Sequence, residues 1–174
     1  GFTPLMYAAA SGCTQTFALL MSKGASLYDQ NYDRETCFHL AVKSKDLEMV
    51  QCVCKPNVID INIKDIKGNT GLLLSIKNQT TNISEYILKS QKQADPNAFD
   101  FEDNSPVHIC ALHGDDTVMK LLLERDGILV NARDKVRETA LFIASKNGKL
   151  EIVKMLLERK DTDVNASNDN GNTP

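Results

Sequence analysis

The chain has 174 residues, 42% of them hydrophobic, and its 20 basic and 23 acidic residues give a formal net charge of −3. Lysine and arginine are spread along the whole sequence, whereas a nucleic-acid-binding protein concentrates them on one face, so nucleic acid is not an expected partner. No apolar run approaches the roughly 18–20 residues that a membrane-spanning helix needs, so direct membrane insertion is not expected either.

Pairs of short helices are the elements that the sequence predicts. Four pairs are expected at residues 4–11 and 14–22, 37–44 and 47–54, 72–78 and 83–90, and 106–112 and 116–125. Pro56 is expected to stop the helix at 47–54. In a fifth pair, Thr139 is a good N-cap, Gly148 breaks the pattern, and a stripe of apolar residues runs from Leu150 to Leu157. Helices this short are unstable alone in water, so each pair must pack on a neighbour.

The helix pairs recur at a nearly constant interval. The first helix of each pair follows a hydroxyl residue, and these anchors are Thr3, Thr36, Thr70, Ser105, Thr139 and Thr173, at steps of 33, 34, 35, 34 and 34 residues. Such a period is typical of a solenoid. We therefore expect a single array over 1–174, with repeats at 1–28, 29–62, 63–97, 98–131, 132–165 and 166–174. Apolar residues on the outer face of the first repeat, such as Phe2 and Phe17, predict that the array is part of a longer one.

The segments Thr3-Pro4-Leu5-Met6-Tyr7-Ala8 and Ser105-Pro106-Val107-His108-Ile109-Cys110 resemble the Thr-Pro-Leu-His-x-Ala signature of ankyrin repeats. The resemblance implies an all-α solenoid of stacked helix-turn-helix pairs with β-hairpin or loop connections. It also implies a cytoplasmic protein that is a monomer in isolation. The third repeat departs most, with Gly71 in place of the signature proline and Gln79 in place of the glycine between the helices, so it is expected to be the weakest.

Catalytic and metal-binding chemistry is not expected. The sequence contains no phosphate-binding glycine loop and no nucleophile elbow. The resemblance implies that His39 and His108 bond backbone groups of the adjacent hairpin. A metal site from Cys37, His39, Cys52 and Cys54 is an alternative, but two cysteines spaced C-x-C on a helix point roughly 200° apart. Free structural thiols are therefore expected, with no cofactor.

Binding is the function that remains, and the resemblance places it on the concave face formed by the hairpins and the first helices. The residues expected to contact a partner are Tyr32, Asp33, Ile66, Lys67, Phe99, Phe101, Glu102, Leu112, His113, Arg133, Lys135 and Val136. Further candidates at equivalent positions are Gln30, Glu35, Lys64, Asn69, Lys77, Asn78, Asn104, Glu138, Lys146 and Asn147.

Tyr32, Ile66 and Phe101 occupy the same tip position in three successive hairpins, and an apolar row at a solvated tip indicates a binding patch. The alternative is that these side chains fold back on neighbouring hairpins. We expect a protein or peptide partner; the other hypothesis is a structural or regulatory segment of a larger channel or enzyme. The setting of Asn165, in Asp163-Val164-Asn165-Ala166 after Leu157, also resembles ankyrin repeats that an oxygen-sensing dioxygenase hydroxylates at Asn; a purely structural Asn165 is the alternative.

Overall fold

The computed structural model describes residues 1–55 and 59–174, and in these ranges the secondary structure is helical, with no residue in a strand. The helices are α1 (Pro4–Ala10), α2 (Thr14–Ser22), α3 (Cys37–Lys43), α4 (Leu47–Cys54), α5 (Gly71–Lys77), α6 (Thr81–Ser90), α7 (Pro106–His113), α8 (Asp116–Leu123), α9 (Ala140–Lys146) and α10 (Leu150–Leu157). The expected fold class is confirmed. Pro56, expected to stop α4, lies outside the described residues.

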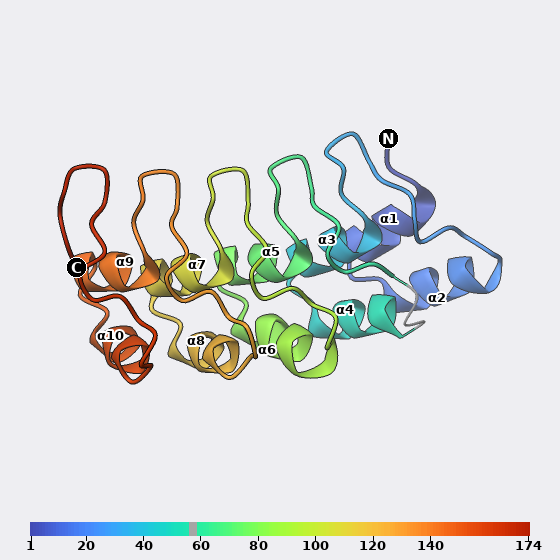
Figure 1. Ribbon diagram of the computed structural model, residues 1–174. Coiled ribbons are helices and arrows are strands. Elements are labelled where there is room, and N and C mark those ends of the chain that lie inside the picture. Colours follow the sequence, from blue (N-terminus) through green and yellow to red (C-terminus); the bar gives the residue numbers. More distant parts are fainter. Residues whose placement is uncertain (56–58) are drawn as a thin grey trace.

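The helices form two layers (Figure 1). The odd-numbered first helices make one row, the even-numbered second helices make a row beneath it, and long loops project from the first row on its other side. The two ends of the chain lie at opposite ends of the row. In the part of the chain that the structure describes, these connections are hairpin-shaped loops without β-ladders. An elongated stack of this kind presents the loops as one continuous face.

The helix boundaries follow from caps that repeat along the chain. The hydroxyl groups of Thr3, Thr70 and Thr139 each accept a hydrogen bond from the backbone N–H three residues on, which satisfies a free donor of the first turn. Two helices differ from expectation by two residues: α6 begins at Thr81 instead of at residue 83, and α8 ends at Leu123 instead of at residue 125. The end of α8 has a local cause. There the Arg125 N–H bonds the Leu122 carbonyl three residues back and closes the helix with a tighter turn.

In the second and fourth repeats a histidine completes the cap. The Thr36 N–H donates to His39 Nδ1 at 3.2 Å, and the other ring nitrogen lies 3.1 Å from the Asn69 carbonyl of the next loop. His108 makes the same pair of contacts with the Ser105 N–H at 3.1 Å and the Ala132 carbonyl at 2.9 Å. The expected structural role of the two histidines is therefore confirmed, and each one joins its helix to the following loop.

The turn between the two helices of a repeat requires a left-handed residue. Glycine meets this requirement in three repeats, but Lys45 and Gln79 adopt positive φ values of 61° and 55° in the second and third. The sequence already showed that Gln79 replaces the glycine of this turn, and the structure shows that Lys45 replaces it in the second repeat as well. A side chain in this region costs energy that glycine avoids.

Candidate functional site

The loops keep their shape because their first residue binds their own backbone. The Asp65 Oδ1 accepts from the N–H groups of Lys67 and Asn69, both at 2.8 Å. The same bonds recur in the other loops, where the accepting residues are Asn31, Asp100, Asp134 and Asn168. A local side-chain bond of this type sets a turn without help from distant residues.

Neighbouring loops are also joined tip to tip. The Ile66 N–H donates to the Asp33 carbonyl at 2.8 Å, and the Phe101 N–H donates to the Lys67 carbonyl at 3.1 Å. Equivalent bonds link the next two loops, from Lys135 to Glu102 and from Asp169 to Val136. The tips are thus joined through their backbones, so their spacing does not depend on the identity of the side chains.

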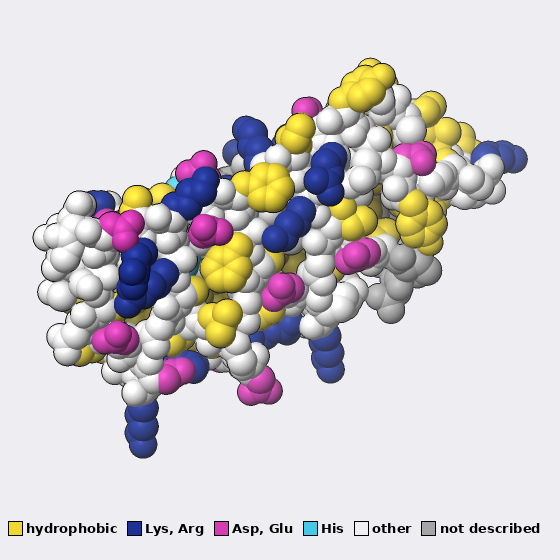
Figure 2. Space-filling model, turned by 45° about the horizontal axis from the view of Figure 1, so that its top comes forward, with side chains coloured by type: hydrophobic (Ala, Val, Ile, Leu, Met, Phe, Trp, Pro, Cys, Tyr) yellow, Lys and Arg dark blue, Asp and Glu magenta, His cyan; other side chains and the backbone are white. Residues whose placement is uncertain are grey.

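Large apolar side chains stand exposed along the tips. Tyr32 is 88% exposed, Phe101 55% and Ile66 50%. Figure 2 shows hydrophobic side chains scattered among charged ones on this side of the molecule. The ring of Phe101 rests partly on Gly68 of the preceding loop, where an added Cβ would lie 2.8 Å from its Cδ1. The ring lies close over this glycine, and more than half of the surface of Phe101 still faces solvent.

Behind the tips, lysines at the ends of the first helices pair with carboxylates at the bases of the loops. Lys43 pairs with Glu35, Lys77 with Asp100 at 2.6 Å, and Lys146 with Glu138 at 3.1 Å. The three lysines share one repeat position, seven residues after the anchor. Lys43 was not among the expected contact residues, although this shared position was visible in the sequence.

The three carboxylates of these pairs are almost completely buried. Glu35, Asp100 and Glu138 are between 3% and 8% exposed, so the outward charge of each pair is the ammonium group. Burial raises the pKa of Asp100, but hydrogen bonds from Lys77, from Asn104 and from the Glu102 N–H outweigh it, and the pKa lies below its usual value. Asp100 therefore stays ionised and fixes the position of Lys77.

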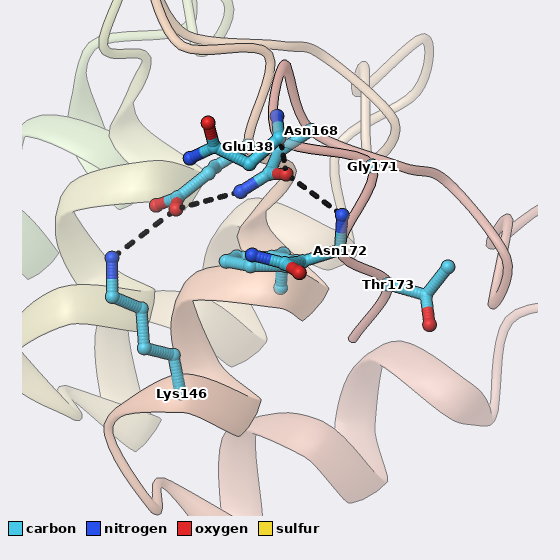
Figure 3. A pocket seen from close by; sticks show the side chains of 8 residues that line it. Glu138, Lys146, Asn168, Gly171, Asn172 and Thr173 are labelled. Atoms are coloured by element: carbon cyan, nitrogen blue, oxygen red, sulfur yellow. Dashed lines mark hydrogen bonds and ion pairs between the residues drawn. The ribbon is translucent and has the colours of Figure 1, made fainter.

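Two hollows open between successive loops where these lysines lie. A hollow of about 450 Å³ is lined by Ile66, Lys67, Lys43, Lys77 and six further residues. A second, of about 710 Å³, lies beside the last loop. Figure 3 shows Lys146 and Asn168 there, both directed at the Glu138 carboxylate, with nitrogen–oxygen distances of 3.1 and 3.4 Å. The two hollows occupy equivalent positions, one between the second and third repeats and one between the fifth repeat and the last loop.

The structure separates the expected contact residues into groups. Tyr32, Asp33, Ile66, Lys67, Phe101, Glu102, Leu112, Lys135 and Val136 are exposed. Phe99, His113 and Arg133 are half-buried. Three further candidates were wrong as contact residues, because Glu35, Asn69 and Glu138 are buried and hold the loops to the lysines or to one another.

His113 does not belong to the loop row. It lines a separate hollow of about 400 Å³ with Gln79, Thr81 and Asp115, at the turns between first and second helices. Its place at the last residue of α7 directs it toward the turn instead of toward the loops. Spacing from the anchor predicts that His113 lies at the end of the helix, but it does not predict whether the side chain points toward the loops or toward the turn.

The alternative metal site does not assemble. Both ring nitrogens of His39 are engaged, by the Thr36 N–H and by the Asn69 carbonyl. Among residues 1–55 and 59–174, no group of three or more histidine, cysteine or acidic side chains is placed to hold a metal ion. The cysteines are free, and burial raises the pKa of Cys37 and of Cys54 to about 12, so their thiols stay protonated and unreactive.

None of the helices described is long and apolar enough to cross a membrane.

The structure is a solenoid of stacked helix pairs. Loops project from its first helices, and histidines complete two of the helix caps. A family model described as ankyrin repeats (3 copies) matches residues 1–65 and 38–134, and one described as ankyrin repeats (many copies) matches residues 121–174. The chain belongs to the ankyrin-repeat family. Ankyrin repeats are in general non-catalytic modules that bind other proteins.

The chain matches ankyrin-containing segments of larger curated proteins. The chain is 27% identical over 159 residues to the human transient receptor potential cation channel subfamily A member 1, covering 87% of this chain and 14% of the channel. It is 30% identical over 142 residues to the nuclear factor NF-kappa-B p105 subunit of Gallus gallus, covering 80% and 14%. Human rabankyrin-5 is 26% identical over 149 residues, covering 85% and 13%. The chain thus spans only about a seventh of each relative.

Proposed function

We propose that this chain is a protein-interaction module that binds a protein or peptide, as a monomer in the cytoplasm, through its loop tips and the adjoining ends of its first helices. It carries out no catalysis of its own. Nucleic acid is not its ligand, because the exposed cations alternate with acidic side chains such as Asp33 and Glu102.

The observation that carries the proposal is the exposed row of Tyr32, Ile66 and Phe101. Folding does not require large apolar groups at these tips, because the loops are already closed by side-chain bonds and joined by backbone bonds. A partner that covers such side chains gains free energy from the removal of their apolar surface from water. Aromatic groups that are held in position before binding are typical of interface hot spots.

Capture of partners by the purified chain, followed by mass spectrometry and measurement of affinity, tests this function. Phe101→Ala is expected to weaken binding of a captured partner by about 1–3 kcal/mol with little effect on folding. Leu19→Ala is the matched control, because Leu19 is an exposed apolar residue on a second helix, away from the loops. Unchanged affinity of the Phe101 variant for every captured partner would remove this residue from the site.

A structural or regulatory segment of a larger protein is the second candidate. It is favoured by the small share of each relative that the chain covers, one of these relatives being a channel. In that case the loop face would contact another part of the same polypeptide, or nothing. Identical behaviour of the wild-type and Phe101→Ala fragments in all capture experiments would favour this candidate.

A further inference from the structure

The fourth repeat interrupts the row of lysines on the concave face. The position held by Lys43, Lys77 and Lys146 is held there by Leu112, which is 47% exposed. The buried carboxylate of the preceding loop does not lack a cation, because Asp100 already receives Lys77 from the third repeat. A lysine at position 112 is therefore not needed to neutralise Asp100. Leu112 instead places an apolar side chain between the cationic side chains of the neighbouring repeats.

The surroundings of Leu112 follow from the repeat. In the equivalent hollow of the second and third repeats, Lys43 lies together with the tip residues of its own loop and of the next. In the next two hollows along the array, the same arrangement places Leu112 beside Phe101 and Glu102 of its own loop and beside Lys135 and Val136 of the following one. Phe101 and Val136 are both more than half exposed. The middle of the concave face therefore has three exposed apolar side chains, with Glu102 and Lys135 beside them.

Cations stand on both sides of this apolar centre. Lys77 lies on the preceding first helix and Lys146 on the following one, and their carboxylate partners are buried beneath them. Lys67 extends the cationic side at the third loop, and its side chain is exposed. Glu102, an acid exposed nearby, has Lys135 at 3.8 Å. Lys67, Lys77, Lys135 and Lys146 therefore outnumber Glu102 around the apolar centre.

We propose that the segment bound by this face carries a bulky apolar residue that packs on Leu112 and Phe101, with acidic residues on both sides of it that pair with Lys77 and Lys146. This inference rests on the proposed function and narrows it to one class of partner, an acidic peptide segment with an apolar anchor. Long-range attraction between such a segment and the lysines speeds their encounter and weakens with added salt.

Selection from a display library of random peptides tests the proposal without a known partner. Peptides of about 12 residues span up to roughly 40 Å when extended, which is enough to cross several loops. Peptides enriched on the wild-type chain are expected to place Leu, Ile, Met or Phe between Asp or Glu residues. A labelled copy of the most enriched peptide then serves as the probe in fluorescence polarisation at low and high salt.

Variants of the chain separate the two parts of the site. Leu112→Lys gives the fourth repeat the residue found at this position in three other repeats, so the fold is retained. It is expected to weaken binding about tenfold or more, whereas Leu112→Met retains binding. Lys67→Glu is expected to weaken binding several-fold and to reduce its dependence on salt. Lys92→Glu, a reversal of the same charge at an exposed position after α6, leaves binding unchanged.

The outcomes distinguish this inference from the function on which it rests. Basic or uncharged peptides that lose affinity on Phe101→Ala would overturn the acidic-segment proposal and leave the binding function standing. The same holds for acidic peptides that bind Leu112→Lys as well as the wild type. Peptides indifferent to both Phe101→Ala and Leu112→Lys, or no enrichment at all, would count against both.

Discussion

The ring of Phe38 occupies the space that a side chain at Gly71 would need. A Cβ added to Gly71 would lie 2.2 Å from Phe38 Cε1 and 2.6 Å from Cδ1. Gly71 stands at the first position of α5, where α1 and α7 have proline. Phe38 stands on α3, at a position where three other repeats have leucine. The unusual glycine and the unusual phenylalanine thus complement each other across the boundary between the second and third repeats.

Gly71→Ala is therefore expected to destabilise the protein, although alanine is the better helix former. The buried Phe38 ring has to move, and overpacking of this kind costs about 1–3 kcal/mol. In a Phe38→Leu background the same change is expected to be neutral or stabilising, because leucine vacates the space. Urea unfolding of the four proteins in the cycle measures the coupling. Equal costs of Gly71→Ala in both backgrounds would show that the two residues do not interact.

Gln79 gives a second prediction for the third repeat. Its φ of 55° is strained for a side-chain-bearing residue, and Gly12, Gly114 and Gly148 hold the equivalent turns. Gln79→Gly is expected to stabilise the protein by up to about 1 kcal/mol, because relief of the left-handed strain exceeds the greater freedom of glycine in the unfolded chain. Lys45→Gly, at the same turn of the second repeat, is expected to behave alike. Destabilisation by both changes would contradict this account of the turn.

Hydrogen exchange locates the effect of Gln79→Gly within the array. The third repeat is expected to exchange fastest apart from the chain ends, and its core contains a further weakness. Ser75 and Ser84 are completely buried between α5 and α6 and bond each other at 2.8 Å, where other repeats pack apolar groups. Gln79→Gly should slow exchange in α5 and α6. Protection of these helices equal to that of α9 and α10 in the wild type would rule out a weak third repeat.

The repeat period made most of the fold predictable, since each anchor fixed a cap and a helix pair to within two residues. The side-chain pairs that join repeats were not predictable in the same way. The Phe38–Gly71 and Lys77–Asp100 pairs each join residues of two successive repeats. In the sequence each of these residues is seen only within its own repeat, so the contact between them is not apparent. For the candidate site, the period placed Tyr32, Ile66 and Phe101 in one row. It could not show that Glu35 and Glu138 turn inward, because burial depends on the lysine of the following helix.

The two capping histidines predict a loss of stability in mild acid. Burial lowers the pKa of His39 and of His108, which outweighs the opposing effect of their bonds to the backbone carbonyls. Above about pH 6.5 both the folded and the unfolded chain carry neutral imidazoles, so the stability is at its full value. As the pH falls below this value, the unfolded chain binds protons first, and the free energy of unfolding decreases.

Urea unfolding at about pH 7.5 and about pH 5.5 measures this decrease, and both values lie above the range where carboxylates titrate. The stabilising effect of Asp100, whose pKa is lowered, is lost only in stronger acid, as the pH falls through that folded-state value. A His39→Gln/His108→Gln variant is expected to be less stable at the higher pH but nearly insensitive to the change. A decrease of the same size in this variant would assign the effect to other groups.

Asn165 is where any β-hydroxylation of this chain is expected. Its counterparts Asn62, Asn97 and Asn131 each hold the next loop with two bonds from the side-chain amide. Asn97 donates to the Gly127 carbonyl and accepts from the Leu129 N–H, both at 2.9 Å. Asn62 and Asn131 make the same pair of bonds. A dioxygenase would have to break both bonds and open the connection to the next repeat to reach these amides.

Asn165 makes the local bond that Asn62 and Asn97 also make: its backbone N–H donates to Asp163 Oδ1 at 3.0 Å, and the residue is exposed. It is distinguished by its sequence setting, because among the four asparagines Asn165 alone follows Asp-Val with a leucine, Leu157, eight residues before it. An exposed loop of this type can enter an enzyme groove as an extended segment at small cost. Mass spectrometry of peptides from the protein in its native cells is expected to find any added oxygen on Asn165 alone. Oxygen on Asn97 or Asn131 would contradict the protective role of the two bonds, and no addition in cells that contain the dioxygenase would leave Asn165 a purely structural residue.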